Sequence, residues 1–214
     1  MHPYQKEFIE FAVKNDVLSF GDFIMKSGRR CPYFFNAGKF NTGRALHVLG
    51  QFYADAIQQS GVEYDVLFGP AYKGIPLVVA AAIGLANNQD LDKPYCFNRK
   101  EIKDHGEGGN IVGAPLKGRV LLVDDVITAG TAIRDSMQLV QQAGATLAGV
   151  VIAVDRQERG QSTKSAVQEV KELYGAPVFA IVTLDNILEY IAEHTKWKQY
   201  VPSIEAYRKE WGVV

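Results

Sequence analysis

One stretch of the chain, residues 120–132, constrains the fold more than any other. It reads VLLVDDVITAGTA. The first four residues form a short apolar run, typical of a strand that is covered on both faces of a sheet. Two adjacent carboxylates and a loop of small residues follow, and the loop leads into a helical pattern. A buried strand that turns directly into a helix indicates an α/β fold with parallel strands.

The end of this expected strand also has the composition of a ligand site. In open α/β sheets ligands bind at the carboxyl ends of the strands, where Asp124 and Asp125 lie, and helix-opening amides favour an anion. Gly130 lets a phosphate approach the backbone, and Thr128 and Thr131 add hydroxyl donors. Because two carboxylates repel a phosphate, we expect the pair to face ribose hydroxyls, with or without a metal ion.

Two other interpretations also fit this string. It can be a buried strand with a helix cap, in which Asp125 and Thr128 only satisfy backbone amides. It can also be the acidic strand of a nucleoside triphosphatase. That second reading needs a GxxxxGK[ST] loop elsewhere, and the sequence contains none.

The rest of the chain alternates between strand and helix patterns. Such alternation predicts an α/β fold with a mostly parallel central sheet and helices on both faces. We expect helices over 3–14, 44–60, 74–87, 131–143, 164–174, 184–192 and 203–211, and strands over 66–68, 95–98, 120–123, 147–155 and 178–181. A hairpin of 23–25 and 33–36 falls outside this pattern. We expect a single domain, 1–214, to which residues 1–40 contribute a separate N-terminal hood.

Two further loops carry charge suited to anions. The sequence GPAYKG at 69–74 joins an expected strand to a helix, so its amides and Lys73 point to the ligand edge; alternatively it is a plain turn. Residues 99–109, RKEIKDHGEGG, offer Arg99, Lys100, Lys103 and His105 from one glycine-rich segment. We expect a mobile lid that closes on a polyanion, the alternative being a solvated surface loop.

The hairpin and the strand at 147–155 add candidates for binding a flat anionic ring. Lys26 in the hairpin turn supplies a cation, and Phe34 and Phe35 supply rings, although two aromatic residues here can equally be core. Arg156 follows the strand directly. It is placed either for a bidentate contact with a substrate carboxylate or for a surface ion pair.

Charge and cysteine content narrow the class of protein. A formal net charge of −1 over 214 residues does not favour binding to nucleic acid or to a membrane surface. The longest apolar stretch, 75–86, is too short to span a bilayer, and the N-terminus lacks the apolar core of a signal peptide. Cys31 and Cys96 lie far apart without metal-ligand spacing. We therefore expect a reduced, cytoplasmic protein.

Taken in order, these features resemble the orotate phosphoribosyltransferases, a family of type I phosphoribosyltransferases. They are the hairpin lysine, the Phe-Phe pair, GPAYKG, the 99–109 segment, the 120–132 string and DRQER at 155–159. The resemblance implies the type I phosphoribosyltransferase fold. It also implies transfer of the phosphoribosyl group of 5-phosphoribosyl 1-pyrophosphate (PRPP) to orotate, giving orotidine 5-monophosphate and pyrophosphate in pyrimidine (UMP) biosynthesis. A cis peptide bond between Ala71 and Tyr72 is implied as well.

The resemblance further implies a role for each candidate residue. Catalytic roles are implied for Lys26, Lys103, His105, Asp124 and Asp125. Orotate binding is implied for Lys26, Phe34, Phe35, Thr128 and Arg156. PRPP binding is implied for Lys26, Tyr72, Lys73, Arg99, Lys100, Lys103, His105, Asp124, Asp125, Val126, Ile127, Thr128, Ala129, Gly130, Thr131 and Ala132. Mg²⁺ is the implied cofactor, held mainly by substrate oxygens rather than by protein ligands.

The same resemblance implies a homodimer whose 99–109 loop reaches over the ligand of the neighbouring subunit. Two other functions stay open at this point. One is a salvage phosphoribosyltransferase for another nucleobase. The other is a non-catalytic regulator that senses PRPP, although such a regulator would normally add a basic nucleic-acid-binding region that this sequence lacks.

Overall fold

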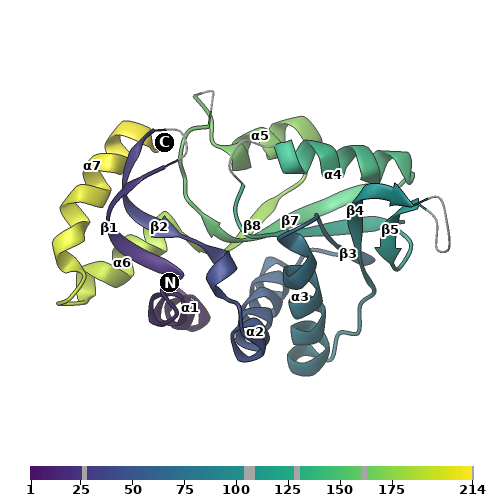
Figure 1. The fold of residues 1–214 in the computed structure, drawn as a ribbon, viewed down its shortest axis with the longest axis horizontal. Coiled ribbons are helices and arrows are strands. Elements are labelled where there is room, and N and C mark those ends of the chain that lie inside the picture. The colour runs from purple at the N-terminus through teal and green to yellow at the C-terminus, as the bar shows by residue number, and fades with distance from the viewer. Residues whose placement is uncertain (26–27, 104–108, 128–130, 161–162, 214) are drawn as a thin grey trace.

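The centre of the molecule is a six-stranded sheet with the strand order β5-β4-β3-β6-β7-β8 (Figure 1). The structure, a computed structural model, describes residues 1–25, 28–103, 109–127, 131–160 and 163–213. The strands are β3 (Val66–Gly69), β4 (Tyr95–Lys103), β5 (Gly109–Gly113), β6 (Arg119–Asp124), β7 (Thr146–Asp155) and β8 (Val178–Thr183). Neighbours from β4 to β8 run parallel, and β5 pairs antiparallel with β4 at the edge.

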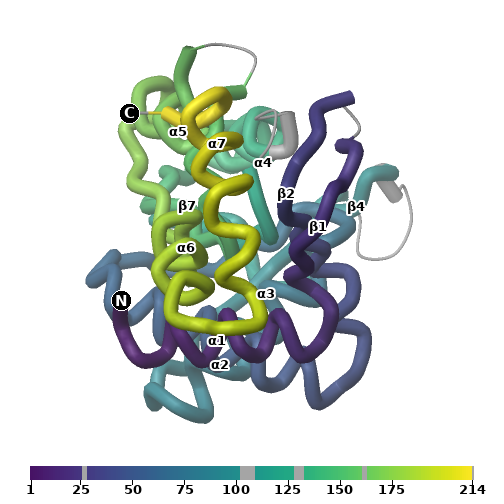
Figure 2. Tube along the Cα trace, turned by 90° about the vertical axis from the view of Figure 1, so that its left-hand side faces the viewer, coloured from purple at the N-terminus to yellow at the C-terminus, as the bar shows by residue number. Residues whose placement is uncertain are grey.

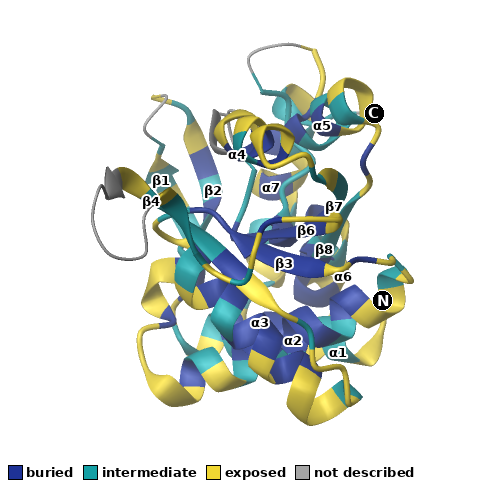
Figure 3. Ribbon diagram, turned by 90° about the vertical axis from the view of Figure 1, so that its right-hand side faces the viewer, coloured by how far each residue is buried: buried dark blue, intermediate teal, exposed yellow. Residues whose placement is uncertain are grey.

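Helices cover both faces of this sheet (Figure 1). On one face α2 (Gly43–Ser60) and α3 (Gly74–Gln89) pack in the same core as Leu121 and Val123 of β6. On the other face α4 (Thr131–Gln142) and α5 (Ala166–Tyr174) share a core with Val120 and Leu122. Side chains alternate along a strand, so the unbroken apolar run of β6 supplies both cores. Figure 3 shows the buried residues of the central strands between these layers.

The α2 and α3 helices approach each other backbone to backbone. A Cβ atom added at Gly50 would lie 2.2 Å from the carbonyl oxygen of Ala80. One added at Gly84 would lie 2.2 Å from the carbonyl oxygen of Gly50. These two glycines therefore set the distance between the helices. At its C-terminus α2 is capped by Gly61 with φ of 62°, a left-handed conformation that favours glycine.

The N-terminal hairpin and the C-terminal helices pack together beside the sheet (Figures 1 and 2). β1 (Leu18–Ile24) and β2 (Arg30–Phe35) form a separate two-stranded antiparallel sheet. The hairpin is followed by the 3₁₀ turn η1 (Ala37–Lys39). Around it lie α1 (Pro3–Lys14), α6 (Leu184–Glu193), η2 (Lys198–Tyr200) and α7 (Val201–Trp211). The ring of Tyr33 in β2 meets the ring of Tyr207 in α7 edge to face at 6.3 Å.

The structure corrects the sequence prediction for the 99–109 segment. Residues 99–103 continue β4, and Gly109 begins β5, a strand that the sequence pattern did not predict. Ladder pairing of Asn98 with Ile111 and of Lys103 with Gly109 joins the two strands. β4 would otherwise be the sheet edge, and its unpaired backbone groups outweigh the local preference of charged residues and glycine for a loop. Residues 104–108 lie outside the described part of the chain.

Most other predicted bounds agree with the structure within two or three residues, but β1 begins earlier than expected, at Leu18. None of the helices in the described ranges is long and apolar enough to cross a membrane.

Candidate active site

Two buried carboxylates lie at the carboxyl end of the central strand β6. Asp124 is 8% exposed and Asp125 is 6% exposed. Asp124 Oδ1 accepts a hydrogen bond from the backbone N–H of Asp125 at 2.8 Å, and Asp125 Oδ1 accepts one from Val126 at 2.9 Å. The Tyr53 hydroxyl of α2 donates to the carbonyl oxygen of Asp124 at 2.8 Å. Tyr53 of α2 therefore fixes the end of the strand, although no sequence motif indicates this residue.

The two carboxylates differ in their electrostatic surroundings. Lys73 Nζ lies 2.7 Å from Asp125 Oδ2 and compensates its charge. Burial, together with the negative charge of Asp125, raises the pKa of Asp124 to about 7, against smaller lowering effects from the Asp125 amide and Lys73. A ligand that offers hydroxyl donors or positive charge to this pair would relieve the cost of its burial.

The loop after β3 brings Lys73 to the same edge. The peptide bond between Ala71 and Tyr72 is cis, which confirms that expectation. The Ala71 amide donates to Asn98 Oδ1 of β4 at 2.8 Å, so the neighbouring strand holds the loop. A Cβ atom at Gly69 would lie 2.2 Å from the carbonyl oxygen of Gly74, so only glycine permits this close turn. Asn98 is not among the residues that the sequence motifs mark, although it ends the strand that the sequence predicts at 95–98.

Basic and aromatic side chains from β4 join this loop. Lys100 Nζ lies 5.1 Å from the ring centroid of Tyr72, whose side chain projects into solvent. Arg99 Nη1 donates to the carbonyl oxygen of Gly109 on β5 at 3.4 Å. The structure thus brings Tyr72, Lys73 and Lys100 to one edge, beside Asp125.

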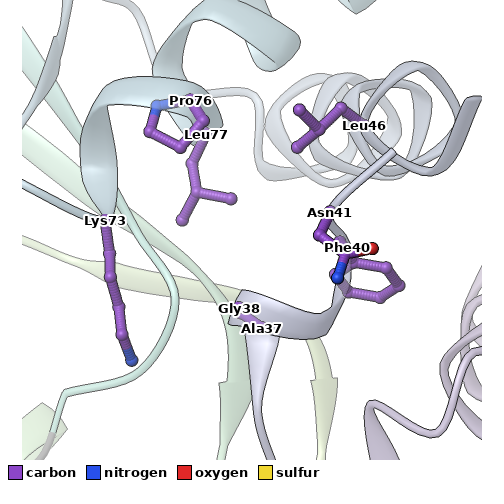
Figure 4. A pocket seen from close by; sticks show the side chains of 8 residues that line it. All are labelled: Ala37, Gly38, Phe40, Asn41, Leu46, Lys73, Pro76 and Leu77. Atoms are coloured by element: carbon purple, nitrogen blue, oxygen red, sulfur yellow. The ribbon is translucent and has the colours of Figure 1, made fainter. Parts of the chain in front are cut away.

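A mostly apolar hollow of about 280 Å³ lies next to Lys73 (Figure 4). Its walls come from η1 and the residues after it, from α2, and from the start of α3. The lining residues are Ala37, Gly38, Phe40, Asn41, Leu46, Lys73, Pro76 and Leu77. Of the expected site residues that the structure describes, Lys73 is the one that lines this hollow, so the hollow lies at the flank of the polar site.

Arg156 lies in a polar cluster between β7 and the hairpin rather than on the open surface. Its guanidinium pairs with Glu158, with Nη2 2.9 Å from Oε1, and both side chains are mostly buried. Nε also donates to the Tyr33 hydroxyl at 3.2 Å, and Nη2 donates to Cys31 Sγ at 3.3 Å. The Arg156 carbon Cζ lies 5.0 Å from the Tyr33 ring centroid. The alternative of an exposed ion pair is therefore wrong.

Phe34 and Phe35 lie on opposite faces of β2, as neighbours on a strand do. Phe34 stacks with Phe23 across the hairpin at 5.6 Å between ring centroids. Phe35 packs in the core, with its ring centroid 6.5 Å from that of Phe8. The two rings cannot sandwich one ligand, because strand alternation turns them apart. Phe34 therefore places its ring on the face of the hairpin that points away from the core.

Several expected site residues fall outside what the structure describes. They are Lys26, His105, Thr128, Ala129 and Gly130, together with the side chains of Lys103, Thr131 and Ala132. Val126 and Ile127, which follow the two carboxylates, are half-buried and pack into the cores on opposite faces of the sheet. No group of three or more metal-ligating side chains occurs among the described residues.

Comparison with known proteins settles the family. Residues 41–186 match the family model of the phosphoribosyl transferase domain. Over 213 residues the chain is 61% identical to an orotate phosphoribosyltransferase of Cronobacter sakazakii, with 100% of both chains covered. The chain belongs to the orotate phosphoribosyltransferase family. An orotate phosphoribosyltransferase of Escherichia coli is 60% identical over 213 residues, again with 100% of both chains covered.

A solved structure agrees with this assignment. The crystal structure of orotate phosphoribosyltransferase from Francisella tularensis superposes with a TM-score of 0.88 at 46% identity, covering 96% of this chain and 99% of that one. The type I phosphoribosyltransferase fold expected from the sequence is thereby confirmed, with its mostly parallel sheet and helices on both faces. As an orotate phosphoribosyltransferase, the chain keeps its two buried carboxylates at the ligand edge of that sheet.

Proposed function

We propose that the carboxyl edge of the sheet transfers the phosphoribosyl group of PRPP to orotate, with orotidine 5-monophosphate and pyrophosphate as products. This is the reaction of the family, and it serves pyrimidine biosynthesis. The observation that carries the assignment of the site is the meeting of two loops from neighbouring strands. One bears the buried pair Asp124 and Asp125, and the other bears Lys73.

The reaction needs mainly positioning and charge neutralisation. The anomeric carbon passes through an oxocarbenium-like state while the highly charged pyrophosphate departs. Asp124 and Asp125 accept hydrogen bonds from the ribose hydroxyls, and residues 126–131 hold the 5-phosphate. The groups on the pyrophosphate side are Tyr72, Lys73, Arg99, Lys100, Lys103 and His105. What supports this division is that Tyr72, Lys73 and Lys100 converge beside the carboxylates.

Mg²⁺ fits this donor set as a partner of the substrate. The protein offers two adjacent carboxylates, and hard cations such as Mg²⁺ prefer oxygen ligands. The described residues hold no group of three ligating side chains, so substrate and water oxygens would complete the coordination. When bound, the ion neutralises charge on the pyrophosphate. Asp124 and Asp125 orient the ribose hydroxyls beside it.

Orotate is assigned to the hairpin side of the site. Arg156 meets its carboxylate, Phe34 provides the flat face, and Phe35 contributes through its main chain because its ring is in the core. Lys26 and Thr128 complete the orotate set from segments beyond the described residues. A carboxylate held by a planar guanidinium distinguishes orotate from uracil, which lacks that group.

The organisation of the protein follows from the same proposal. Residues 1–214 form one domain with residues 1–40 as its hood. It works as a homodimer that shares active sites through the 99–109 segment, and it binds neither nucleic acid nor membranes. A cytoplasmic location is supported by Cys31 and Cys96, which are both buried free thiols, as a reducing compartment would leave them.

An assay of base consumption tests the proposed reaction. The purified protein is given PRPP, Mg²⁺ and either orotate, uracil, hypoxanthine or adenine. We expect orotate to be consumed with release of pyrophosphate. The other bases should react at least about 100-fold more slowly, because they would leave buried polar groups of the site unpaired. Preference for another base would establish a salvage enzyme. PRPP binding without turnover of any base would establish a regulator.

A substitution tests the assignment of the orotate carboxylate. Arg156→Ala should raise the KM for orotate by about 10- to 100-fold, the range of a charged hydrogen bond, and should leave the KM for PRPP within about threefold. Lys117→Ala removes an exposed cation that precedes β6 and serves as the control. An unchanged KM for orotate in Arg156→Ala would remove Arg156 from the site.

A further inference from the structure

Glu158 lies at the centre of the polar cluster behind Arg156. Its Oε1 accepts hydrogen bonds from Arg156 Nε at 3.0 Å and from the Tyr33 hydroxyl at 2.6 Å. Its Oε2 accepts one from the Tyr207 hydroxyl at 3.0 Å. These partners come from three separate parts of the chain, namely the segment after β7, strand β2 and helix α7. Both carboxylate oxygens are therefore engaged.

This cluster fixes the plane of the Arg156 guanidinium. Nε and Nη2 both point to Glu158 Oε1, so one edge of the planar group is docked on the carboxylate. The Tyr33 ring lies beside the guanidinium carbon at 5.0 Å, and Cys31 Sγ meets Nη2 at 3.3 Å. Among the described residues, these contacts involve Nε and Nη2 and leave the Nη1 edge for a ligand.

Burial makes the contact with Glu158 decisive for the orientation of the Arg156 side chain. Its side chain is 13% exposed and that of Arg156 is 14% exposed, so neither has a full shell of water to orient it. Tyr33 and Tyr207 are buried as well. In such surroundings the orientation of a long cationic side chain is decided by its protein partners, because few water molecules compete for its donors.

We propose that Glu158 is a positioning residue for orotate recognition, which aims Arg156 at the substrate carboxylate and is itself held in place by Tyr207 of α7. This inference rests on the proposed function, since it takes Arg156 as the group that meets orotate. It makes the C-terminal helix α7 part of the base-recognition apparatus, although α7 lies far along the chain from every motif of the site.

The charge and the geometry of Glu158 can be separated by substitution. In Glu158→Gln the amide oxygen still accepts from Arg156 and Tyr33, and the amide N–H₂ can donate to the Tyr207 hydroxyl. In Glu158→Ala all of these contacts are lost. Positioning through hydrogen-bond geometry therefore predicts rescue by glutamine, while a need for the negative charge itself predicts that both variants fail alike.

The experiment measures kcat and the KM for each substrate in the full-length protein. Glu158→Ala should raise the KM for orotate about tenfold, with the KM for PRPP changed less than threefold, since a charge-assisted contact is lost on one substrate only. Glu158→Gln should stay within threefold of the wild type for both substrates. Tyr207→Phe should raise the KM for orotate by a few fold. Arg208→Ala, on the same helix but paired with Asp185 of α6 at 2.6 Å, should leave both KM values unchanged.

A double substitution decides whether Glu158 acts through Arg156. In an Arg156→Ala background, Glu158→Ala should cause no further rise in the KM for orotate, because the positioned group is already absent. Additive losses, or equal losses for both substrates with a lower melting temperature, would reduce Glu158 to a structural role and overturn the inference. If Arg156→Ala itself leaves the KM for orotate unchanged, the assignment of Arg156 fails. If only Glu158→Ala leaves it unchanged, the inference alone fails.

Discussion

At the scale of single residues, Asp124 carries a charge that is costly in the free protein. The carboxylate is buried, and it lies beside Asp125, which is the partner that Lys73 neutralises. Burial and this neighbouring charge raise its pKa to about 7. The folded state therefore holds a proton on Asp124 over a pH range in which the unfolded chain has already released it. In the proposed function, the ribose hydroxyls of the substrate would supply hydrogen-bond donors to this carboxylate.

The stability of Asp124→Asn is expected to depend on pH. Because the folded-state pKa is raised, the wild-type protein loses stability as the pH rises from about 4 to about 7, and the full cost is present above pH 7. Asparagine keeps the acceptor for the Asp125 amide without the charge. The melting temperature of the variant relative to the wild type should therefore be several degrees higher at about pH 8.5 than at about pH 4.5.

The matched control is Asp92→Asn at an exposed position. Its melting temperature relative to the wild type should be nearly the same at the two pH values. The burial argument would be refuted if the melting temperature of Asp124→Asn, relative to the wild type, fell between about pH 4.5 and about pH 8.5. Activity of Asp124→Asn should be low at both pH values, because the ribose contact then lacks its charge.

At the scale of elements, the contact between α2 and α3 positions both loops of the site. α2 carries Tyr53, which holds the end of β6, and α3 begins directly after Lys73. Where the helices cross, Gly50 and Gly84 allow their backbones to touch. A displacement of α3 would therefore shift Lys73 relative to Asp125.

Gly50→Ala is expected to destabilise the protein by about 1–3 kcal/mol, the usual cost of an added methyl group in a packed interior. The new Cβ would lie 2.2 Å from the Ala80 carbonyl oxygen, so the helices have to separate. Gly43→Ala, at the start of the same helix, meets nothing within 4 Å and should be neutral or slightly stabilising. Urea unfolding of both variants gives the comparison, and equal stabilities would contradict the close helix contact.

At the scale of the whole molecule, the proposed homodimer would use the edge of the sheet that β4 and β5 form. β5 is the outermost strand, and β4 carries Arg99 and Lys100. The hood packs with α7 through Glu158, and in the proposed function it contributes the orotate side of the site. A shared site would combine strands β4 and β5 of one subunit with the N-terminal hood of the other in a closed two-fold assembly.

Subunit exchange between two inactive variants tests this arrangement. Lys26→Ala and Lys103→Ala should each be nearly inactive. Mixed in equal amounts, half of the dimers become heterodimers, and each heterodimer has one of its two sites with both lysines intact. Activity should then recover to about one quarter of the wild-type value. Exchange demonstrated with labelled subunits, but without recovered activity, would show that each segment serves its own subunit.

Local patterns in the sequence sufficed for most of the secondary structure and for the place of two adjacent carboxylates at the carboxyl end of a central strand. The run at 120–123, the paired Asp124 and Asp125, and the cap at Gly61 depend on side-chain alternation, turn chemistry and backbone conformation, which are properties of neighbours along the chain. Alternation of strands and helices was likewise enough for the class of fold. Family resemblance supplied the cis bond before Tyr72 and the nature of the substrates.

Tertiary structure alone decided which distant groups meet. Tyr53 supports Asp124 from 71 residues away, and Tyr207 holds Glu158 from 49 residues away. β5 forms because the edge of β4 needs a partner, in spite of its glycines and charged neighbours. Phe35 packs against Phe8 in the core, which leaves Phe34 on the other face of the hairpin, stacked with Phe23. Such contacts depend on how whole elements pack. A local sequence pattern shows that a side chain will be buried, but it does not show which distant residue will contact that side chain.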